Sequence, residues 1–262
     1  MAVLYEIAGW ADILLWIVFA VQVAYLLFFA WKGGMLRPWS AVRRPVRSKR
    51  RFAVFFPAYK EDRVILSSVR SFLEQDYPKE LFDLVVISDQ MQPETNEALR
   101  TLPIRLLMAD YTESSKAKAL AMAMNNIDTD LYDIVVIMDA DNVTVPEFLS
   151  CINRAFDSGV RSIQAHRTGK NLNTDISILD SASEEINNGF FRSGHNALGL
   201  SAGLSGSGMA FDAKWFQQNV QYLQTAGEDK ELESMLLQQR IHTVYLNDLP
   251  VFDEKTQKKE AI

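Results

Sequence analysis

The sequence predicts an α/β domain built on a mixed, mostly parallel sheet with flanking helices, preceded by one transmembrane helix. The first observation behind this prediction is a single long apolar run near the amino terminus. The second is that short β-rich runs alternate with helical patterns from residue 52 onward, an order typical of parallel strands joined by crossover helices. A chain of 262 residues has room for one medium-sized domain and such a helix.

The apolar run covers residues 10–31 and supplies about the ~20 residues that a helix needs to cross a ~30 Å hydrocarbon core. Trp10 and Trp31 lie at its two ends, where tryptophan commonly meets the lipid headgroups. A cleaved signal peptide is the alternative. It is less favoured because the basic residues follow the apolar run instead of preceding it.

Residues 32–51 contain eight Lys and Arg residues and no acidic residue, whereas Glu6 lies on the other side of the helix. This asymmetry predicts that the rest of the chain is cytosolic. The basic segment is either a solvated linker or a contact with anionic lipid. The expected organisation is therefore an amino-terminal segment 1–9, a transmembrane helix 10–31, a basic juxtamembrane linker 32–51 and a catalytic domain 52–262.

The overall composition excludes several classes of protein. The formal net charge of -6 argues against a general nucleic-acid binder, which needs clustered Lys and Arg. The single cysteine, Cys151, cannot form an internal disulfide, and the three histidines have no cysteine companions for a zinc site.

The expected strands and helices alternate along the domain. The β-rich runs are FAVFF at 52–56, LFDLVVIS at 81–88, IRLLM at 104–108, LYDIVVIM at 131–138 and IHTVYL at 241–246. Helical patterns cover 64–73, 114–127 and 175–191, and another helix begins near Glu228.

Ligands of parallel sheets collect at the carboxyl ends of the strands, so the residues after each β-rich run are candidates for a site. Tyr59 and Glu61 follow the first run, and Asp89 follows the second. These residues suit recognition of a base or ribose. Each carboxylate has an alternative role as the cap of the next helix.

The strongest local signal is Asp139-Ala140-Asp141, directly after the apolar run 131–138. Residues two apart in an extended chain point the same way, so both carboxylates can face one site. They would repel each other without a cation, and their hard oxygen ligands suit Mg²⁺ or Mn²⁺. The alternative is a turn that happens to use two aspartates.

Three other segments are candidates. Lys116 and Lys118 lie near the amino end of a helix, where a cation is unfavourable unless it meets an anion such as a phosphate; otherwise they are exposed solubilising lysines. The small residues 203–208 permit close approach of backbone to a ligand, or form a tight turn. The acidic pair Glu228-Asp229 begins a helix, which is also ordinary capping.

Taken together, the motifs P-A-Y-K-E-D, S-D, K-A-K-A-L, D-A-D, S-G-S-G and G-E-D resemble family 2 glycosyltransferases with the GT-A nucleotide-sugar-binding fold. The resemblance is greatest to the membrane branch with cellulose-synthase-like, poly-N-acetylglucosamine-synthase-like and ceramide-glucosyltransferase-like enzymes. It implies that Tyr59, Glu61 and Asp89 hold the donor nucleotide and that Lys118 lies near it. Asp139 and Asp141 match the D-x-D pair, with Asp141 the expected direct ligand of Mg²⁺ or Mn²⁺.

The same resemblance implies a mechanism. Ser205, Gly206, Ser207 and Glu228 match the acceptor side, and Asp229 matches the general base. The implied reaction is an inverting, metal-dependent transfer from a nucleotide-diphosphate sugar, UDP-sugars being favoured, to a hydroxyl of a lipid or glycan acceptor at the cytosolic membrane face. The alternatives are a nucleotidyltransferase and a catalytically silent subunit that binds nucleotide sugars.

The sequence departs from the family pattern at two places. Lys60 replaces the usual asparagine before Glu61. The Q-x-x-R-W motif of the membrane branch is absent before the sequence ends at Ile262, so we expect a fragment whose remainder carries that motif and further membrane helices. His166, which follows an expected strand in Gln164-Ala165-His166-Arg167, is expected either to assist at the metal or phosphate or to be a structural histidine.

Overall fold

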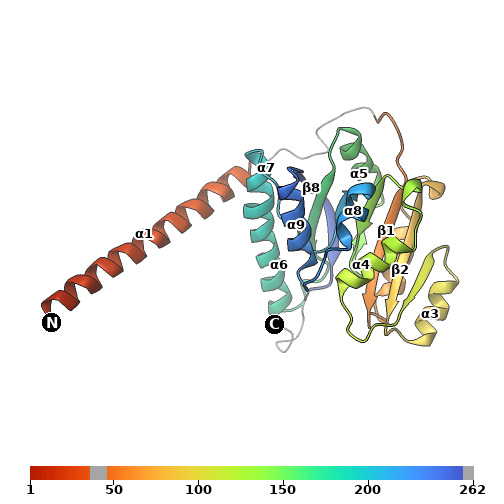
Figure 1. Cartoon of the computed structure of the whole chain (residues 1–262), viewed down its shortest axis with the longest axis horizontal. Helices are drawn as coiled ribbons and strands as arrows, with labels where there is room; N and C mark the ends of the chain where they lie inside the picture. Colours follow the sequence, from red (N-terminus) through yellow and green to blue (C-terminus); the bar gives the residue numbers. More distant parts are fainter. Residues whose placement is uncertain (36–45, 256–262) are drawn as a thin grey trace.

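The computed structural model describes residues 1–35 and 46–255. The middle of the predicted basic linker and the end of the chain, Lys259 to Ile262 included, lie outside the described residues. One long helix, α1 (Ala2–Gly33), projects from an α/β domain (Figure 1). Its residues Tyr5–Gly33 are long and apolar enough to cross a membrane. The helix contains the predicted span 10–31 and begins earlier than that span.

The domain is built on one eight-stranded sheet with the order β3-β2-β1-β4-β7-β6-β8-β5. The strands are β1 (Phe52–Tyr59), β2 (Phe82–Asp89), β3 (Arg105–Ala109), β4 (Ile134–Ile137), β5 (Val143–Thr144), β6 (Ser162–Gly169), β7 (Met209–Asp212) and β8 (Thr243–Asp253). Strands β1 to β4 are mutually parallel, and β8 is parallel to β6. Strand β7 is antiparallel to both neighbours, and β5 is antiparallel to β8. The predicted mixed α/β fold is confirmed.

Helices cover both faces of the sheet (Figure 1). They are α2 (Ile65–Leu73), α3 (Pro93–Arg100), α4 (Lys116–Asn125), α5 (Phe148–Asp157), α6 (Asp175–Asn187), α7 (His195–Ala197), α8 (Ala213–Val220) and α9 (Glu228–Gln238). Short helical segments are η2 (Lys79–Leu81), η3 (Thr129–Leu131) and the π-helix η4 (Asn188–Gly194). The predicted helix 175–191 is therefore α-helical only to Asn187 and continues as a π-helix.

Alternation along the strands divides the core into two layers. Phe56 packs with Phe72 and Phe148 against α2 and α5, whereas its neighbour Phe55 packs with Phe216 on the face covered by α4, α8 and α9. Successive side chains of a strand point to opposite faces, so one β-rich run builds both layers. The sheet is consequently buried on both faces. The carboxyl ends of its parallel strands remain accessible to ligands.

Candidate active site

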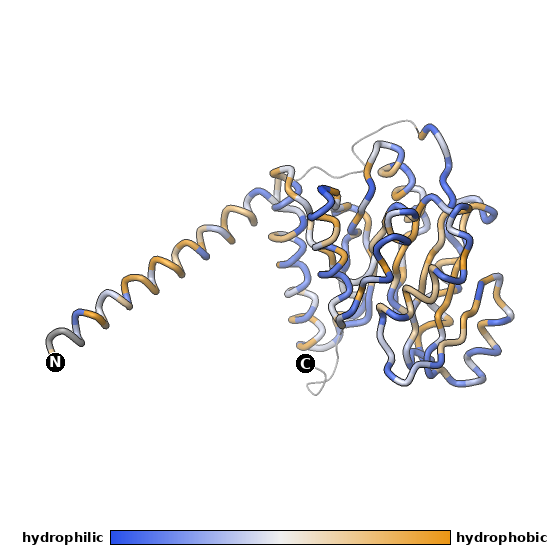
Figure 2. Tube along the Cα trace, viewed as in Figure 1, coloured by the Kyte–Doolittle hydropathy of each residue, from blue (hydrophilic) through white to orange (hydrophobic). Residues whose placement is uncertain are grey.

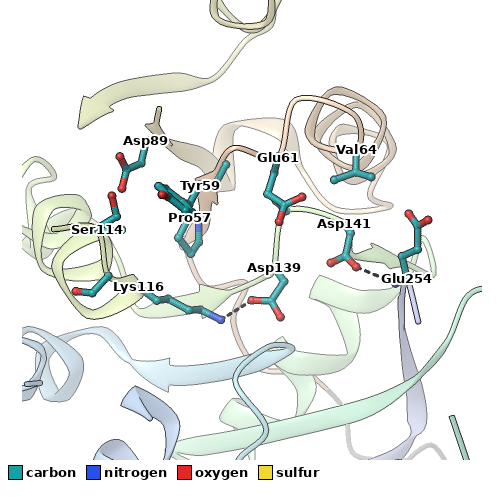
Figure 3. Close-up of a pocket in the computed structure, with 14 residues that line it drawn as sticks. Pro57, Tyr59, Glu61, Val64, Asp89, Ser114, Lys116, Asp139, Asp141 and Glu254 are labelled. Atoms are coloured by element: carbon teal, nitrogen blue, oxygen red, sulfur yellow. Dashed lines mark hydrogen bonds and ion pairs between the residues drawn. The ribbon is translucent and has the colours of Figure 1, made fainter. Parts of the chain in front are cut away.

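A cavity of about 620 Å³ lies at the carboxyl ends of β1, β2 and β4 (Figure 3). Tyr59, Glu61 and Val64 come from β1 and the turn after it, and Asp89 ends β2. The remaining lining residues come from the start of α4, the turn after β4 and the end of β8: Ser114, Ser115, Lys116, Ala119, Asp139, Ala140, Asp141 and Glu254. Six candidate residues from the sequence, Tyr59, Glu61, Asp89, Lys116, Asp139 and Asp141, therefore share one cavity.

The strand register accounts for this gathering. Tyr59 and Asp89 are paired positions at the ends of the parallel strands β1 and β2. The residue after each strand adopts a left-handed backbone conformation, with φ of 56° at Lys60 and 53° at Gln90. Such conformations are uncommon for residues other than glycine and concentrate at functional sites. They turn the chain sharply away, which leaves the strand ends open to a ligand.

One end of the cavity is suited to a polar organic ligand. The Asp89 side chain is buried, and its Oδ1 has no hydrogen-bond partner. A buried acceptor without a partner typically costs ~1–3 kcal/mol, so a ligand that donates a hydrogen bond is favoured there. Figure 3 shows Asp89 beside the Tyr59 ring and Ser114, and the Ser114 Oγ also lacks a partner. A hydroxyl or base N–H fits this arrangement.

The other end of the cavity gathers carboxylates. Burial and the negative charges of Asp141 and Asp139 raise the pKa of Glu61. Burial also raises the pKa of Asp141, against the hydrogen bond that its Oδ2 accepts from the Glu254 backbone N–H (2.8 Å). Figure 3 shows Glu61, Asp139 and Asp141 facing the same space. These raised values mean that the negative charges are under-compensated, so a cation at this end of the cavity is stabilised.

The donor set fits a hard divalent cation such as Mg²⁺ or Mn²⁺, which bind carboxylate oxygens. Within residues 1–35 and 46–255, no group of three or more His, Cys, Asp or Glu side chains encloses a metal position. Mg²⁺ is usually held by one or two carboxylates, with substrate phosphates and water completing its coordination. Asp141, with Asp139, would supply that protein part.

Lys116 connects three of the predicted motifs. Its Nζ donates to the Asp139 carboxylate and to the Gly206 carbonyl oxygen (2.7 Å), and it lies 3.5 Å from Glu228 Oε1. Burial alone would lower the pKa of Lys116. The negative charges of Asp139 and Glu228 outweigh this effect, so the pKa lies above its ordinary value. Burial likewise acts to raise the pKa of Asp139, yet Lys116 and Arg167 hold it below its ordinary value. The pair is therefore charged.

Lys118 lies outside the cavity. Its ammonium donates to the Glu113 carbonyl oxygen (2.7 Å) and lies 6.0 Å from the Tyr111 ring centroid, at the limit for a cation–π contact. It lines a neighbouring depression with these residues and Asp110. The structure thus brings Lys116, and not Lys118, together with the other predicted residues.

Asp229 lines a second cavity of about 460 Å³. Ser205 from the small-residue segment lies there too, and its Oγ lacks a hydrogen-bond partner. Ser207 is fully buried, and Gly206 meets Lys116 at the boundary with the first cavity. Glu228 faces Lys116, and only Asp229 of the acidic pair at the start of α9 lines the second cavity.

Arg167 and Glu254 were not singled out by sequence reasoning. Arg167 follows the buried part of β6, donates to the Ser205 carbonyl oxygen and pairs with Asp253. Glu254 directly follows β8, and its backbone N–H donates to Asp141. The position of Glu254 directly after a strand was the available signal for that residue, whereas Arg167 lies within the polar second half of β6. His166 is bonded to Glu185 and to the Asn247 carbonyl oxygen, as its structural role predicts.

Removing the Lys116 ammonium should destabilise the domain. We expect Lys116→Met to lower the free energy of unfolding by about 3 kcal/mol, the low end of the ~3–5 kcal/mol for breaking a buried ion pair, because its side chain remains 23% exposed. The matched change Lys118→Met should alter it by less than ~0.5 kcal/mol, as at other surface positions. Denaturant unfolding in detergent, followed by circular dichroism, measures both; equal losses would contradict the assigned role of Lys116.

Comparison with known proteins agrees with this arrangement. The sequence profile described as "Glycosyltransferase like family 2" matches residues 49–262. Among curated protein sequences, none matches the chain significantly.

Several solved structures share the fold. A mannosyltransferase from Pyrobaculum calidifontis in complex with GDP-Man and Mn²⁺ is 18% identical with a TM-score of 0.66, over 92% of this chain and 67% of that chain. S. aureus TarS 1–349 in complex with UDP-GlcNAc is 16% identical with a TM-score of 0.58, over 80% and 60%. Glucosyl-3-phosphoglycerate synthase from Mycobacterium tuberculosis, with Mn²⁺ and UDP, is 16% identical with a TM-score of 0.52, over 84% and 80%.

The profile covers most of the chain and all of the residues that line the two cavities. The solved structures share the chain's mixed α/β fold. The chain therefore belongs to glycosyltransferase family 2.

Proposed function

We propose that the chain transfers a sugar from a nucleotide-diphosphate donor to a hydroxyl acceptor, with inversion at the anomeric carbon and with Mg²⁺ or Mn²⁺ as cofactor. The observation that carries the proposal is the division of the first cavity into two chemically different ends. The unpartnered buried oxygen of Asp89 beside Tyr59 suits the ribose or base, and the under-compensated carboxylates Glu61 and Asp141, next to Asp139, suit a cation. A nucleotide diphosphate that chelates a metal joins these two requirements.

The residues of the second cavity complete the reaction. Asp229 is the proposed general base, which takes the proton of the acceptor hydroxyl as its oxygen attacks the anomeric carbon. Lys116 holds Asp139, Glu228 and the Gly206 carbonyl together, so it fixes the wall between donor and acceptor. A divalent metal, when bound, neutralises the charge of the departing diphosphate.

Solved structures of the same fold with GDP-Man, UDP-GlcNAc and UDP support a nucleotide-sugar donor and leave the base open. UDP-sugars stay the favoured donors from the motif resemblance, and a lipid or glycan is the proposed acceptor. We do not expect a nucleic-acid partner.

A donor screen tests the proposed function. The full-length protein in detergent or vesicles is incubated with UDP- and GDP-sugars and Mn²⁺, and the release of nucleotide diphosphate is measured. We expect release from one class of donor. Release of pyrophosphate instead would indicate a nucleotidyltransferase, and binding of donors without release would indicate a catalytically silent subunit; both outcomes contradict the proposal.

The proposal includes a topology, with α1 in the membrane and the domain in the cytosol. It is supported by the apolar helix Tyr5–Gly33 and by the basic residues that follow it. We expect protease added to right-side-out vesicles to leave residues 52–255 intact, and to digest them after the vesicles are permeabilised. Digestion in sealed vesicles would contradict the cytosolic placement.

A further inference from the structure

Helix α6 packs on the domain with polar side chains facing the domain and apolar side chains facing outward. Its buried side chains are Ser177 and Ser181. Leu179 is 70% exposed and Ile186 is 55% exposed. A helix on the surface of a soluble domain ordinarily turns its apolar stripe toward the core. The outward face of α6 is therefore suited to contact an apolar environment outside the domain.

This exposed apolar surface continues beyond α6. Through η4, α7 and the following loop, further large apolar side chains are exposed, and we call the whole set the apolar ridge: Ile178, Leu179, Ile186, Phe191, Leu198 and Leu200. Figure 2 shows apolar positions recurring along α6, on the side of the domain from which α1 projects. A group of large apolar side chains exposed along consecutive elements of this kind indicates an interaction site.

Two acidic groups of α6, Glu184 and Glu185, are compensated within the domain. The Glu184 carboxylate accepts a hydrogen bond from the buried Arg192 (2.7 Å). The Glu185 carboxylate lies 2.9 Å from His166 Nε2. These contacts bind both carboxylates to inward-facing partners, so the ridge itself is dominated by Ile, Leu and Phe.

The ridge begins where α1 is fixed to the domain. Phe29 of α1 is buried, and the Tyr25 hydroxyl lies 3.1 Å from Nε2 of His195 in α7. The backbones touch closely, since a Cβ added at Gly194 would lie 2.5 Å from the Phe29 carbonyl oxygen, and one at Gly33 would lie 3.2 Å from the Gly194 nitrogen. The last two turns of α1 are thus held rigidly against η4 and α7.

The length of α1 determines how deep its contact with η4 and α7 lies relative to a bilayer. The candidate span Tyr5–Gly33 has 29 residues. At 1.5 Å per residue it is ~43 Å long, compared with ~30 Å of hydrocarbon. The segment from Tyr25 to Gly33 accounts for ~12 Å of it, so these turns lie near the headgroups. The elements that hold them, η4 and α7, lie at the same level.

We propose that the apolar ridge inserts into the headgroup region of the bilayer that α1 crosses, so that α1 and α6–α7 together seat the domain on the lipid. Phe191 and His195 also line the second cavity, which contains Asp229. The seated domain therefore opens that cavity at the lipid surface, and an acceptor anchored in the bilayer can reach it. This last consequence rests on the proposed function; the seating itself rests only on the contacts above.

Site-directed spin labels test the seating in the full chain, reconstituted in phosphatidylcholine vesicles. Leu179→Cys and Ile186→Cys are labelled singly with a nitroxide in a Cys151→Ser background. The matched control is Met108→Cys, because Met108 is a similarly exposed apolar residue (48%) on β3, at the opposite end of the strand order from β8 and β5. Collisions of each label with lipid-soluble oxygen and with an aqueous nickel chelate give its depth.

We expect the labels at 179 and 186 to lie ~5–10 Å into the headgroup and acyl boundary, the depth of interfacial helices, and the label at 108 to be fully aqueous. Labels at 179 and 186 as accessible to the nickel chelate as the control would overturn the proposal. Labels shielded from both oxygen and nickel would overturn it too, because a protein surface would then cover the ridge. The measurement needs neither donor nor transfer, so its failure is distinct from a failure of the proposed function.

Discussion

Asp229→Asn is expected to abolish most sugar transfer while leaving donor binding within a few-fold of the unsubstituted protein. The asparagine keeps the size of the side chain and can still accept the hydrogen bond from the Lys230 backbone N–H (2.8 Å). It cannot take a proton from the acceptor. General base catalysis typically contributes ~10²–10⁴ in rate, and we expect a loss of kcat in that range. Transfer assays and nucleotide titrations on the same preparation measure the two effects separately.

The matched control for this change is Glu231→Gln, which lies in the same first turn of α9. The Glu231 carboxylate accepts hydrogen bonds from Thr225 and the Gln224 backbone, so it stabilises the start of the helix without facing either cavity. If Asp229 only capped α9, both variants would lose activity and donor affinity alike. That outcome would remove Asp229 as the base.

Asp141→Ala is expected to remove the effect of the metal on nucleotide binding. We expect Mn²⁺ to strengthen binding of a nucleotide diphosphate to the unsubstituted protein, and the variant to lose at least ~10-fold of that affinity, since even outer partners of a metal ligand typically contribute 10- to 100-fold. The fold should persist, because Asp141 lies beyond the end of β4. Calorimetric titrations with and without Mn²⁺ measure the difference.

Asp110→Ala is the matched control for the loss of a carboxylate. Asp110 lies in the depression next to the first cavity, together with Lys118. The Asp110→Ala variant should leave the effect of Mn²⁺ on nucleotide binding unchanged if that effect depends on direct coordination by Asp141. An equal weakening in both variants would show that Asp141 acts through its overall charge and not as a ligand.

The sequence was sufficient to predict the strand-end residues that line the first cavity. Continuous apolar runs identified β1, β2 and β4, and the residues at their ends converge because parallel strands finish at one edge of the sheet. The spacing of Asp139 and Asp141 placed both carboxylates on one side. These inferences depend only on local pattern.

The choice between Lys116 and Lys118 was not available from the sequence. Residues two apart on a helix lie ~200° apart around its axis, so only one of the pair can face the cavity. The Ser115 side chain caps α4 by accepting from the Lys118 backbone N–H, which fixes the start of the helix and turns Lys116 inward. The sequence offers two adjacent serines, Ser114 and Ser115, as the N-cap of α4, and the tertiary structure selects Ser115.

Strands β5 and β7 were also not predicted from the sequence, and of β6 only the part before His166 was expected. Strand β7 has four residues and β5 has two, and each is stabilised by antiparallel pairing with a strand distant in the sequence. Strand β6 contains Gln164, His166 and Arg167, whose polar groups are satisfied only by partners that the fold brings to them. The positions of Arg167 and Glu254 follow from these long-range pairings.

The central claim is that a divalent metal and a nucleotide diphosphate bind together at the cavity of Asp89 and Asp141, and Mn²⁺ electron paramagnetic resonance tests it most directly. Free aqueous Mn²⁺ gives a sharp six-line signal that is lost when the ion is bound to protein. We expect the full chain alone to reduce this signal weakly, and the chain with UDP or GDP to reduce it much further than the nucleotide without protein. A signal that the chain leaves unchanged in the presence of either nucleotide would contradict the account.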